Sequence, residues 1–342
     1  MTTSVRGNSL PQGGISATGE PTQGYSLLPD TRTLQLASEN FMENSELNCM
    51  SINTVELAPG QQVMFKVQNV GLGHDLELLI EGSIDFKNAD AVNDVTVTLA
   101  KEFPFNILSN ILSQFNGQTV LHSLSGYELL GIMSKRSKGL FLGAGASVGS
   151  AASSQDKARV DRSLAWIEAG ANVTLTAGDT LTGVASFDVT KNKTGTLNFG
   201  CYLCLPFVLR DDLLLGMLPM QNNSVYSNIS LTVPQLIGTT PKTPFYIAAG
   251  VPATFTVDAA DITAKPTYDF WSIPNPNDPR LYEYFIAHSY MLLSNPANAI
   301  PNVGAEALQY AMPNNYYLMS LLLTLRDSTS ALVNVETYID YP

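Results

Sequence analysis

The sequence predicts an all-β protein, and three observations support this fold class. Charged residues make up only 14% of the 342 residues, and 19 prolines are scattered along the chain. Ser, Thr, Asn, Gly, Val and Leu recur throughout, a composition that suits strands joined by many turns. The segment HDLELLIEGSIDF alternates apolar and polar residues with the period of two that a half-buried strand requires. The length allows two domains of ordinary size, or one large domain with insertions.

The alternating segment 74–86 predicts one buried face and one solvated face. Its apolar positions are Leu76, Leu78, Ile80, Ile84 and Phe86, and its acidic positions are Asp75, Glu77, Glu81 and Asp85. Similar patterns predict strands within 51–70, around a turn at Pro59-Gly60, and within 94–100, where Val95, Val97 and Leu99 alternate. Further strands are expected within 171–189, 196–209, 225–233 and 253–264. A series of strands of this kind predicts sheets rather than helices.

Two local sequence signals predict a hairpin and a helix in the middle of the chain. The pair Asn116-Gly117 separates two β-prone runs in NILSQFNGQTVLHS, which predicts a β-hairpin. In SGYELLGIMSK, Ser125 and Glu128 have the spacing of a capping box, followed by an apolar stripe. A helix is therefore expected to begin at Ser125. The Gly-, Ala- and Ser-rich segment that follows is expected to form a long surface loop.

The first 45 residues are predicted to form a flexible N-terminal arm. This segment is rich in Gly, Ser, Thr and Pro and has too few large apolar side chains to build a core. It has no apolar stretch typical of a signal peptide. Three cysteines are too few for a secreted disulfide framework, which favours folding in a reducing cytoplasm. No apolar run along the chain has the length of a membrane span.

Net charge argues against nucleic acid as the main partner. The formal charge is −12 at pH 7, whereas phosphate contacts need clustered Lys and Arg. A protein coat that keeps nucleic acid at a distance remains compatible with this charge. We expect no specific binding of nucleic acid.

The motif Cys201-x-x-Cys204 is the strongest candidate for a metal or redox site. Two cysteines three apart on a strand point to opposite faces, so they cannot ligate one ion together. A thioredoxin-like site would need the motif at the start of a helix. The histidines that might complete a metal site are far apart in sequence, at positions 74, 122 and 288. We therefore interpret both cysteines as small packing residues and expect no metal site.

The remaining candidate motifs also have structural explanations. The segment GAGASVG at 143–149 misses the dinucleotide-binding spacing by one residue, and a flexible loop is favoured. Adjacent Asp211 and Asp212 fit a helix cap better than a glycosidase pair. The basic residues Lys135, Arg136 and Lys138 fit stabilisation of a helix C-terminus.

Asn-x-Ser/Thr triplets begin at Asn172, Asn192, Asn222 and Asn228, and they matter only in a secretory pathway. The aromatic segment YDFWSIPNPNDPRLYEYF favours an interdomain crossover or a subunit contact over a sugar platform. These interpretations leave no catalytic residue and no cofactor-binding residue to name.

The order of the motifs resembles a known family. The segments are NVGLGHDLELLIEGSI, FPFNILSNILSQFNGQTVLHSLSGYELLGIM, the strand end LPF with a charged turn and a Leu-rich helix ending in LP, and PTYDFWSIP. In this order they resemble the double jelly-roll major capsid proteins of tailless icosahedral phages with an internal membrane, the tectivirus-like phages. The resemblance covers roughly residues 45–275.

This resemblance implies an architecture and a role. The expected fold is two jelly-roll β-sandwiches in tandem, with short helices between strands. The expected parts are an N-terminal arm at 1–45, a first jelly roll at 46–265 with a long loop insertion near 139–170, and a short or incomplete second jelly roll at 266–342. The expected function is a non-enzymatic capsid subunit that forms homotrimeric, pseudo-hexagonal capsomers. Neighbouring capsomers, minor capsid and penton proteins are the implied partners, and the arm would be held by neighbouring subunits or by the internal membrane, with protein contacts favoured. The virion is the implied location, after folding and assembly in the host cytoplasm.

Two other function classes stay open on the residues alone. One is a carbohydrate-binding β-sandwich of a phage fibre or lectin, for which the sequence has no distinguishing feature. The other is a jelly-roll enzyme of the cupin or glycosidase type. The enzyme is the weakest alternative, because cupin chemistry needs clustered His and carboxylate ligands and the three histidines are dispersed.

Overall fold

The structure of the chain is a computed structural model, and it describes only part of the sequence. The described residues are 45–116, 119–136, 142–143, 159–160, 164–178, 180–208, 217–220, 226–237, 246–247, 251–272 and 292–293. The predicted arm and the predicted helix after Asp211 lie outside these residues. In the described part, no helix has the length and hydropathy needed to cross a membrane.

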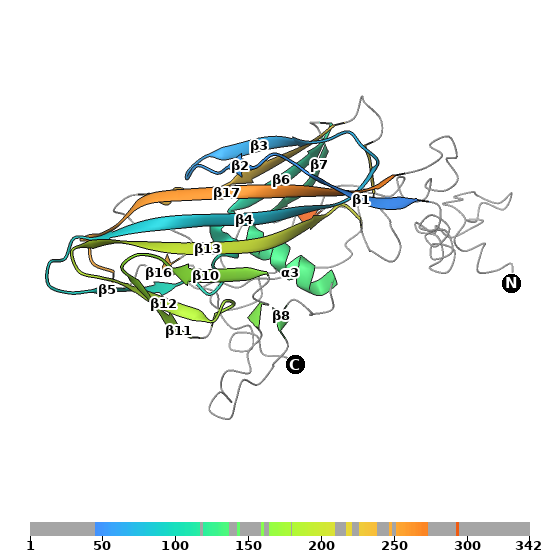
Figure 1. Ribbon diagram of the computed structural model, residues 1–342. Helices are drawn as coiled ribbons and strands as arrows, with labels where there is room; N and C mark the ends of the chain where they lie inside the picture. The colour runs from blue at the N-terminus through green and yellow to red at the C-terminus, as the bar shows by residue number, and fades with distance from the viewer. Residues whose placement is uncertain are drawn as a thin grey trace, which may run out of the picture.

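The largest sheet, called here the long sheet, is built around three long antiparallel strands that run side by side (Figure 1). Its strands, in spatial order, are β1 (Glu46–Ser51), β17 (Phe255–Ser272), β4 (Leu72–Asn88), β13 (Lys193–Pro206) and β10 (Ala165–Ala169). Two short strands extend it, β2 (Val55–Glu56) beside β17 and β14 (Leu218–Pro219) beside β4.

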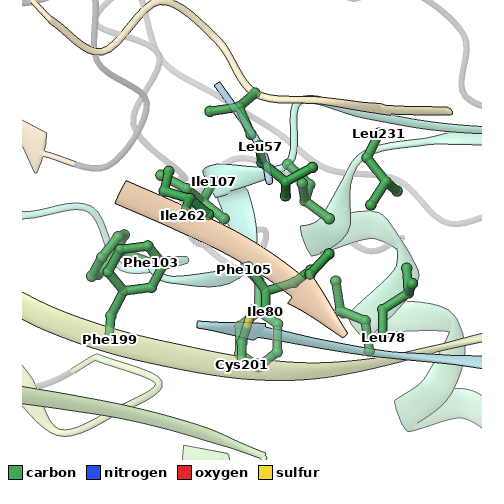
Figure 2. Close-up of a cluster of buried hydrophobic side chains, with 14 of the residues drawn as sticks. Leu57, Leu78, Ile80, Phe103, Phe105, Ile107, Phe199, Cys201, Leu231 and Ile262 are labelled. Atoms are coloured by element: carbon green, nitrogen blue, oxygen red, sulfur yellow. The ribbon is translucent and has the colours of Figure 1, made fainter. Parts of the chain in front are cut away.

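A second sheet, called here the short sheet, packs against one half of the long sheet. Its strands, in spatial order, are β18 (Leu292–Leu293), β7 (Thr119–Leu124), β6 (Asn110–Phe115), β15 (Ser227–Thr232) and β3 (Gln62–Val67). The pairs are antiparallel except for β18, which is parallel to β7. Between the two sheets lies a continuous apolar core, part of which Figure 2 shows.

The connection of these two sheets defines a jelly roll. Eight of their strands, taken in chain order, are β1, β3, β4, β6, β7, β13, β15 and β17. The long sheet holds the first, eighth, third and sixth of these strands, and the short sheet holds the second, seventh, fourth and fifth. Successive strands thus cross between the facing sheets at every step except from the fourth to the fifth, which form a hairpin within the short sheet, and this is the Greek-key order of a jelly roll. The all-β prediction is confirmed, and the described residues contain one complete jelly roll.

A third sheet covers the far half of the long strands (Figure 1). Its strands, in spatial order, are β11 (Val173–Ala177), β12 (Val184–Val189), β5 (Val95–Leu99) and β16 (Tyr246–Ile247). They come from the connections between jelly-roll strands. Phe187 of β12 contacts Phe86 of β4 with ring centroids 4.8 Å apart, so the third sheet extends the same core.

Strand β4 shows why the long sheet forms where it does. The predicted apolar positions Leu76, Leu78, Ile80, Ile84 and Phe86 are all 0% exposed. They line one face of the strand, first against the short sheet and then against the third sheet. Burying five large side chains on one strand contributes on the order of 10 kcal/mol before the entropy of ordering the chain is subtracted. The alternation therefore predicted both the strand and its buried face.

The predicted hairpin and helix are both confirmed. β6 and β7 pair as an antiparallel hairpin, and Asn116 has the positive φ of 53° that suits a tight turn. The helix α3 spans Gly126–Arg136, and the expected capping box is formed. The backbone N–H of Ser125 donates to Glu128 Oε2 at 2.7 Å, and the backbone N–H of Glu128 donates to Ser125 Oγ at 3.3 Å. A short 3₁₀ helix, η1 (Phe105–Ile107), packs against α3.

Within the segment 139–170, where the long loop insertion is predicted, the described residues include three strands, and most of the predicted loop lies outside the described residues. β8 (Leu142–Gly143) pairs with β9 (Arg159–Val160), and β10 adds an edge to β13. β10 forms because Ala165 is buried beside Cys201 while Glu168 and Ala169 remain exposed, which is the pattern of an edge strand.

Strand β17 runs unbroken through residues 265 and 266, where the sequence places a domain boundary. Pro266 lies opposite Leu78 of β4, and its carbonyl accepts a bond from the backbone N–H of Ile52 at 2.9 Å. The nitrogen of Pro266 faces the same side and has no hydrogen to donate to the carbonyl of Ile52, which fits the end of β1 one residue earlier, at Ser51. The eighth strand of the jelly roll ends at Ser272.

Candidate functional site

The outer face of the long sheet is strongly acidic. Its outward carboxylates include Asp75, Glu77, Glu81 and Asp85 on β4, Asp261 and Asp269 on β17, and Glu168 on β10. Lys265 forms an ion pair with Glu81 across the same two strands. The pair is partly exposed, so it contributes little stability by itself. This face is a charged surface suited to water or to a polar partner.

Two carboxylates lie directly opposite each other at one end of this face. Asp75 of β4 and Asp269 of β17 are register partners, and Glu77 lies one row away. Partial burial raises the pKa of Asp269 to about 6, and the charges of Glu77 and Asp75 add to that increase. His74 acts in the opposite direction, and its Nδ1 lies 3.0 Å from Asp75 Oδ2. Asp269 therefore titrates near neutral pH.

Tyr202 of β13 borders this acidic cluster. Burial raises the pKa of the Tyr202 hydroxyl, and a hydrogen bond with Glu77 raises it further. The phenol thus stays protonated and donates to the carboxylate. The described residues contain no group of three or more His, Cys, Asp or Glu side chains placed to hold a metal ion.

The outer face of the short sheet has a different character. Its outward positions are Gln62, Met64 and Lys66 on β3, Asn228, Ser230 and Thr232 on β15, Asn110, Leu112 and Gln114 on β6, and Val120 and Ser123 on β7. Lys66 is the only charged residue in this described set, and its Nζ lies 5.5 Å from the ring centroid of Tyr226. Met64 is 59% exposed. The face is nearly uncharged and displays amide, hydroxyl and apolar groups.

The inner face of the short sheet contains buried polar residues. His122 on β7 pairs with Ser113 on β6, and Ser227 on β15 lies one row away. All three side chains are almost completely buried. Burial lowers the pKa of His122 to about 3, although a hydrogen bond with the backbone of Pro206 partly opposes this effect. The imidazole is therefore neutral in the folded protein, with its ring centroid 5.9 Å from that of Phe207.

The structure separates the two cysteines of the Cys-x-x-Cys motif. Cys201 is 1% exposed on the inner face of β13, near Ile80 and Phe105 (Figure 2), whereas Cys204 is partly exposed and alternates to the outer face. Burial raises the pKa of the Cys201 thiol. The predicted opposite orientation is confirmed, and an inert packing role for Cys201 fits its buried, protonated state.

The other sequence candidates do not come together. His74 lies on β4 and His122 on β7, in different sheets, and His288 lies outside the described residues. Asp211, Asp212, Asn222, the side chains of the basic cluster 135–138 and nearly all of 143–149 also lie outside them. Asn172 and Asn192 have positive φ values of 55° and 51°, so turn geometry explains both. Asn228 lies within β15.

Sequence reasoning missed the pairing of Asp75 with Asp269 and the burial of His122. The acidic residues of β4 were visible in its alternation, but their partner on β17 depends on a register between distant segments. No local signal around His122 distinguished an inward from an outward position, because β7 has a bulge next to it.

The strand order places the described chain among jelly-roll proteins. Comparison with protein-family models and with curated protein sequences gives no match. Among solved structures, the chain is similar to the major capsid protein of Sulfolobus turreted icosahedral virus, with 15% identity and a TM-score of 0.36 over 66% of this chain and 48% of that chain. It is also similar to PBCV-1 VP54, as fitted into a reconstruction of the virophage Sputnik, with 12% identity and a TM-score of 0.34 over 69% and 45% of the two chains.

The solved structures that the chain resembles are double jelly-roll major capsid proteins, as the sequence motifs implied. The chain spans about half the length of each of them. These similarities are weak, and the jelly-roll assignment rests on the strand order of this chain itself.

Proposed function

We propose that this protein is a major capsid protein that builds the shell of an icosahedral virus. The observation that carries the proposal is the complete jelly-roll strand order across the long and short sheets. Jelly rolls also occur in lectins and cupins, so the fold alone does not decide the function. The order of sequence motifs between residues 45 and 275, which resembles double jelly-roll capsid proteins, favours the capsid among these classes.

In this proposal the subunit forms a homotrimer. A trimer with two barrels per chain presents six barrels around its axis, which gives a pseudo-hexagonal capsomer. The second barrel would be built from residues after Ser272, where the eighth strand of the described jelly roll ends. Support for extensive subunit contacts comes from the low charged fraction of the chain, 14%.

Neighbouring capsomers, minor capsid proteins and penton proteins are the partners in this proposal. The arm at 1–45 would contact neighbouring subunits on the inner side of the shell, next to an internal membrane. Its only basic residue before position 32 is Arg6, against the acidic residues Glu20 and Asp30. Attraction to anionic lipid would be weak, so protein contacts are favoured for the arm.

Mass measurement and electron microscopy test the proposal on the full chain. Light scattering should give three times the chain mass of 36.9 kDa, and micrographs of the assembled protein should show hexagonal capsomers or shells. A stable monomer at micromolar concentration would contradict the trimer. Fibres, or discrete particles that bind glycans, would point instead to a fibre or lectin.

Deletion of residues 2–30 tests the arm separately. The deletion touches no described strand, so the thermal melting temperature and trimer mass should stay unchanged while the yield of assembled particles falls. An unchanged particle yield would show that the arm has no role in assembly. A large drop in melting temperature would show that the arm belongs to the barrel.

A further inference from the structure

We propose that the outer face of the short sheet is the docking surface for residues 294–342 of the same chain. The face consists of the outward positions of β3, β15, β6 and β7 given above. The proposal concerns packing within one chain, and it stands whether or not the protein builds a capsid.

The first argument is the lack of charge on this face. Among the described outward positions of this face only Lys66 is charged, in a chain of net charge −12 whose long sheet displays outward carboxylates on β4, β17 and β10. The solvated face of an antiparallel sheet is polar, and on the long sheet of this chain it carries many charged groups. Depletion of charge together with exposed Met and Tyr is instead typical of buried contact surfaces, and here Met64 is 59% and Tyr226 37% exposed.

The second argument is the position of β18. The chain leaves the jelly roll at Ser272, in the long sheet, and by Leu292 it pairs with β7 of the short sheet. Leu292 is the register partner of His122, and Leu293 that of Ser123, which is an outward residue of β7. Residues 294 onward therefore begin at one edge of the uncharged face, which makes this segment the favoured occupant.

The third argument is the reach and composition of the segment. Four strand spacings of about 4.8 Å separate β18 from β3, a distance that roughly six extended residues cover. Residues 294–342 are far longer and include the apolar run YYLMSLLLTL at 316–325 and the alternating end SALVNVETYIDYP. An apolar, weakly charged segment matches an uncharged face, because neither surface has to give up strongly hydrated charges on contact.

Site-specific photo-crosslinking of the full chain tests the docking. Met64 is replaced by p-benzoylphenylalanine, with Gln62 as a second labelled position on the same strand and Val92 as the control. Val92 is 72% exposed in the β4–β5 connection, away from the short sheet. Mixing unlabelled with ¹⁵N-labelled chains before irradiation separates crosslinks within a chain from those between chains. Thermal melting confirms that each labelled protein is folded.

The expected result is crosslinking from positions 62 and 64 to peptides within 294–342 of the same chain, and none from position 92. Crosslinks to another chain would show that a second copy covers the face and would overturn the proposal. Crosslinks to other segments, or none from either labelled position, would also overturn it.

Hydrogen exchange provides an independent measurement on the same face. Met64→Glu places a carboxylate in the proposed contact, so amide exchange within 294–342 should become about tenfold faster. Val92→Glu adds the same charge outside the contact and should leave that exchange unchanged. Equal effects of the two substitutions would contradict the docking without bearing on the capsid proposal, which the mass and microscopy measurements test.

Discussion

The two sheets of the jelly roll differ in where they place charged and buried polar groups. The long sheet is apolar inside, where Leu76, Leu78 and Ile80 are 0% exposed, and acidic outside. The short sheet places Ser113 and His122 inside and is nearly uncharged outside. Both sheets have a mainly apolar inner face and a polar outer face, but only the long sheet has an outer face rich in charged groups. Charge on the outward positions, rather than the number of apolar residues, is what separates the two sheets.

The largest expected effect is a loss of folding stability in acid, caused by the buried histidine on the inner face of the short sheet. The pKa of His122 is about 3 in the fold, against an ordinary value of 6.5, so between pH 6.5 and 3 the unfolded chain binds a proton that the folded chain does not. Stability should therefore fall from about pH 6.5 towards pH 3, by on the order of 5 kcal/mol over the whole window. Urea unfolding at several pH values and fixed protein concentration measures this loss.

His122→Leu is the control for that acid effect. The variant has no titrating group at this position, so its unfolding free energy should fall less steeply over the same pH window. Parallel pH curves for the two proteins would show that other groups cause the acid loss.

The second effect tests the inner face of the long sheet. Phe86 is 0% exposed and contacts Phe187 and Phe255, with ring centroids 4.8 and 5.5 Å away. Phe86→Ala should lower the free energy of unfolding by about 3–5 kcal/mol, because it leaves a cavity where the long sheet meets the third sheet. The neighbouring outward substitution Lys87→Ala should change it by less than about 0.5 kcal/mol. A small effect of Phe86→Ala would mean that the third sheet is not part of the same core.

The smallest effect concerns the outer face of the long sheet. The pKa of Asp269 is raised to about 6 from an ordinary value of 3.8, so the folded protein holds this proton more tightly than the unfolded chain does. Stability should decrease as pH rises from about 3.8 through 6. Asp269→Asn should therefore stabilise the protein by about 1 kcal/mol at pH 8, a figure discounted for the exposure of the group.

At pH 4 the same substitution should have almost no effect, because Asp269 is then largely protonated in the fold. Asp261→Asn, on an exposed position of the same strand, is the matched control and should change stability by less than about 0.5 kcal/mol at either pH. A gain from Asp269→Asn that is the same at pH 4 and pH 8 would exclude charge repulsion as its cause.

The contrast between the sheets also explains how far sequence reasoning reached. The strand β4 was predicted with its buried face because its outer face is charged, so its alternation is visible. The hairpin at Asn116 and the capped helix from Ser125 were predicted because their signals are local. The strand β10 was not predicted, because an edge strand forms only beside its partner, here β13. The full length of β17 was not predicted, because a proline such as Pro266 normally marks the end of a strand.

The candidate surfaces were predicted only in part. The acidic row of β4 follows from its sequence, and so does the opposite orientation of Cys201 and Cys204. The opposition of Asp75 and Asp269 depends on the β4–β17 register, which no local pattern encodes. The inward position of His122 depends on a bulge between Ser113 and Gln114, which shifts the alternation of the hairpin.

The place of β17 between β1 and β4 has a consequence for synthesis on the ribosome. β4 is complete at residue 88, but its neighbour β17 begins only at residue 255. At a translation rate of 5–20 residues per second, one edge of β4 waits roughly 10–30 s for its partner. During that interval a long strand with a fully apolar face has an unpaired edge, the arrangement most prone to pairing with another chain. Newly made protein is therefore most exposed to aggregation before residues 255–272 emerge.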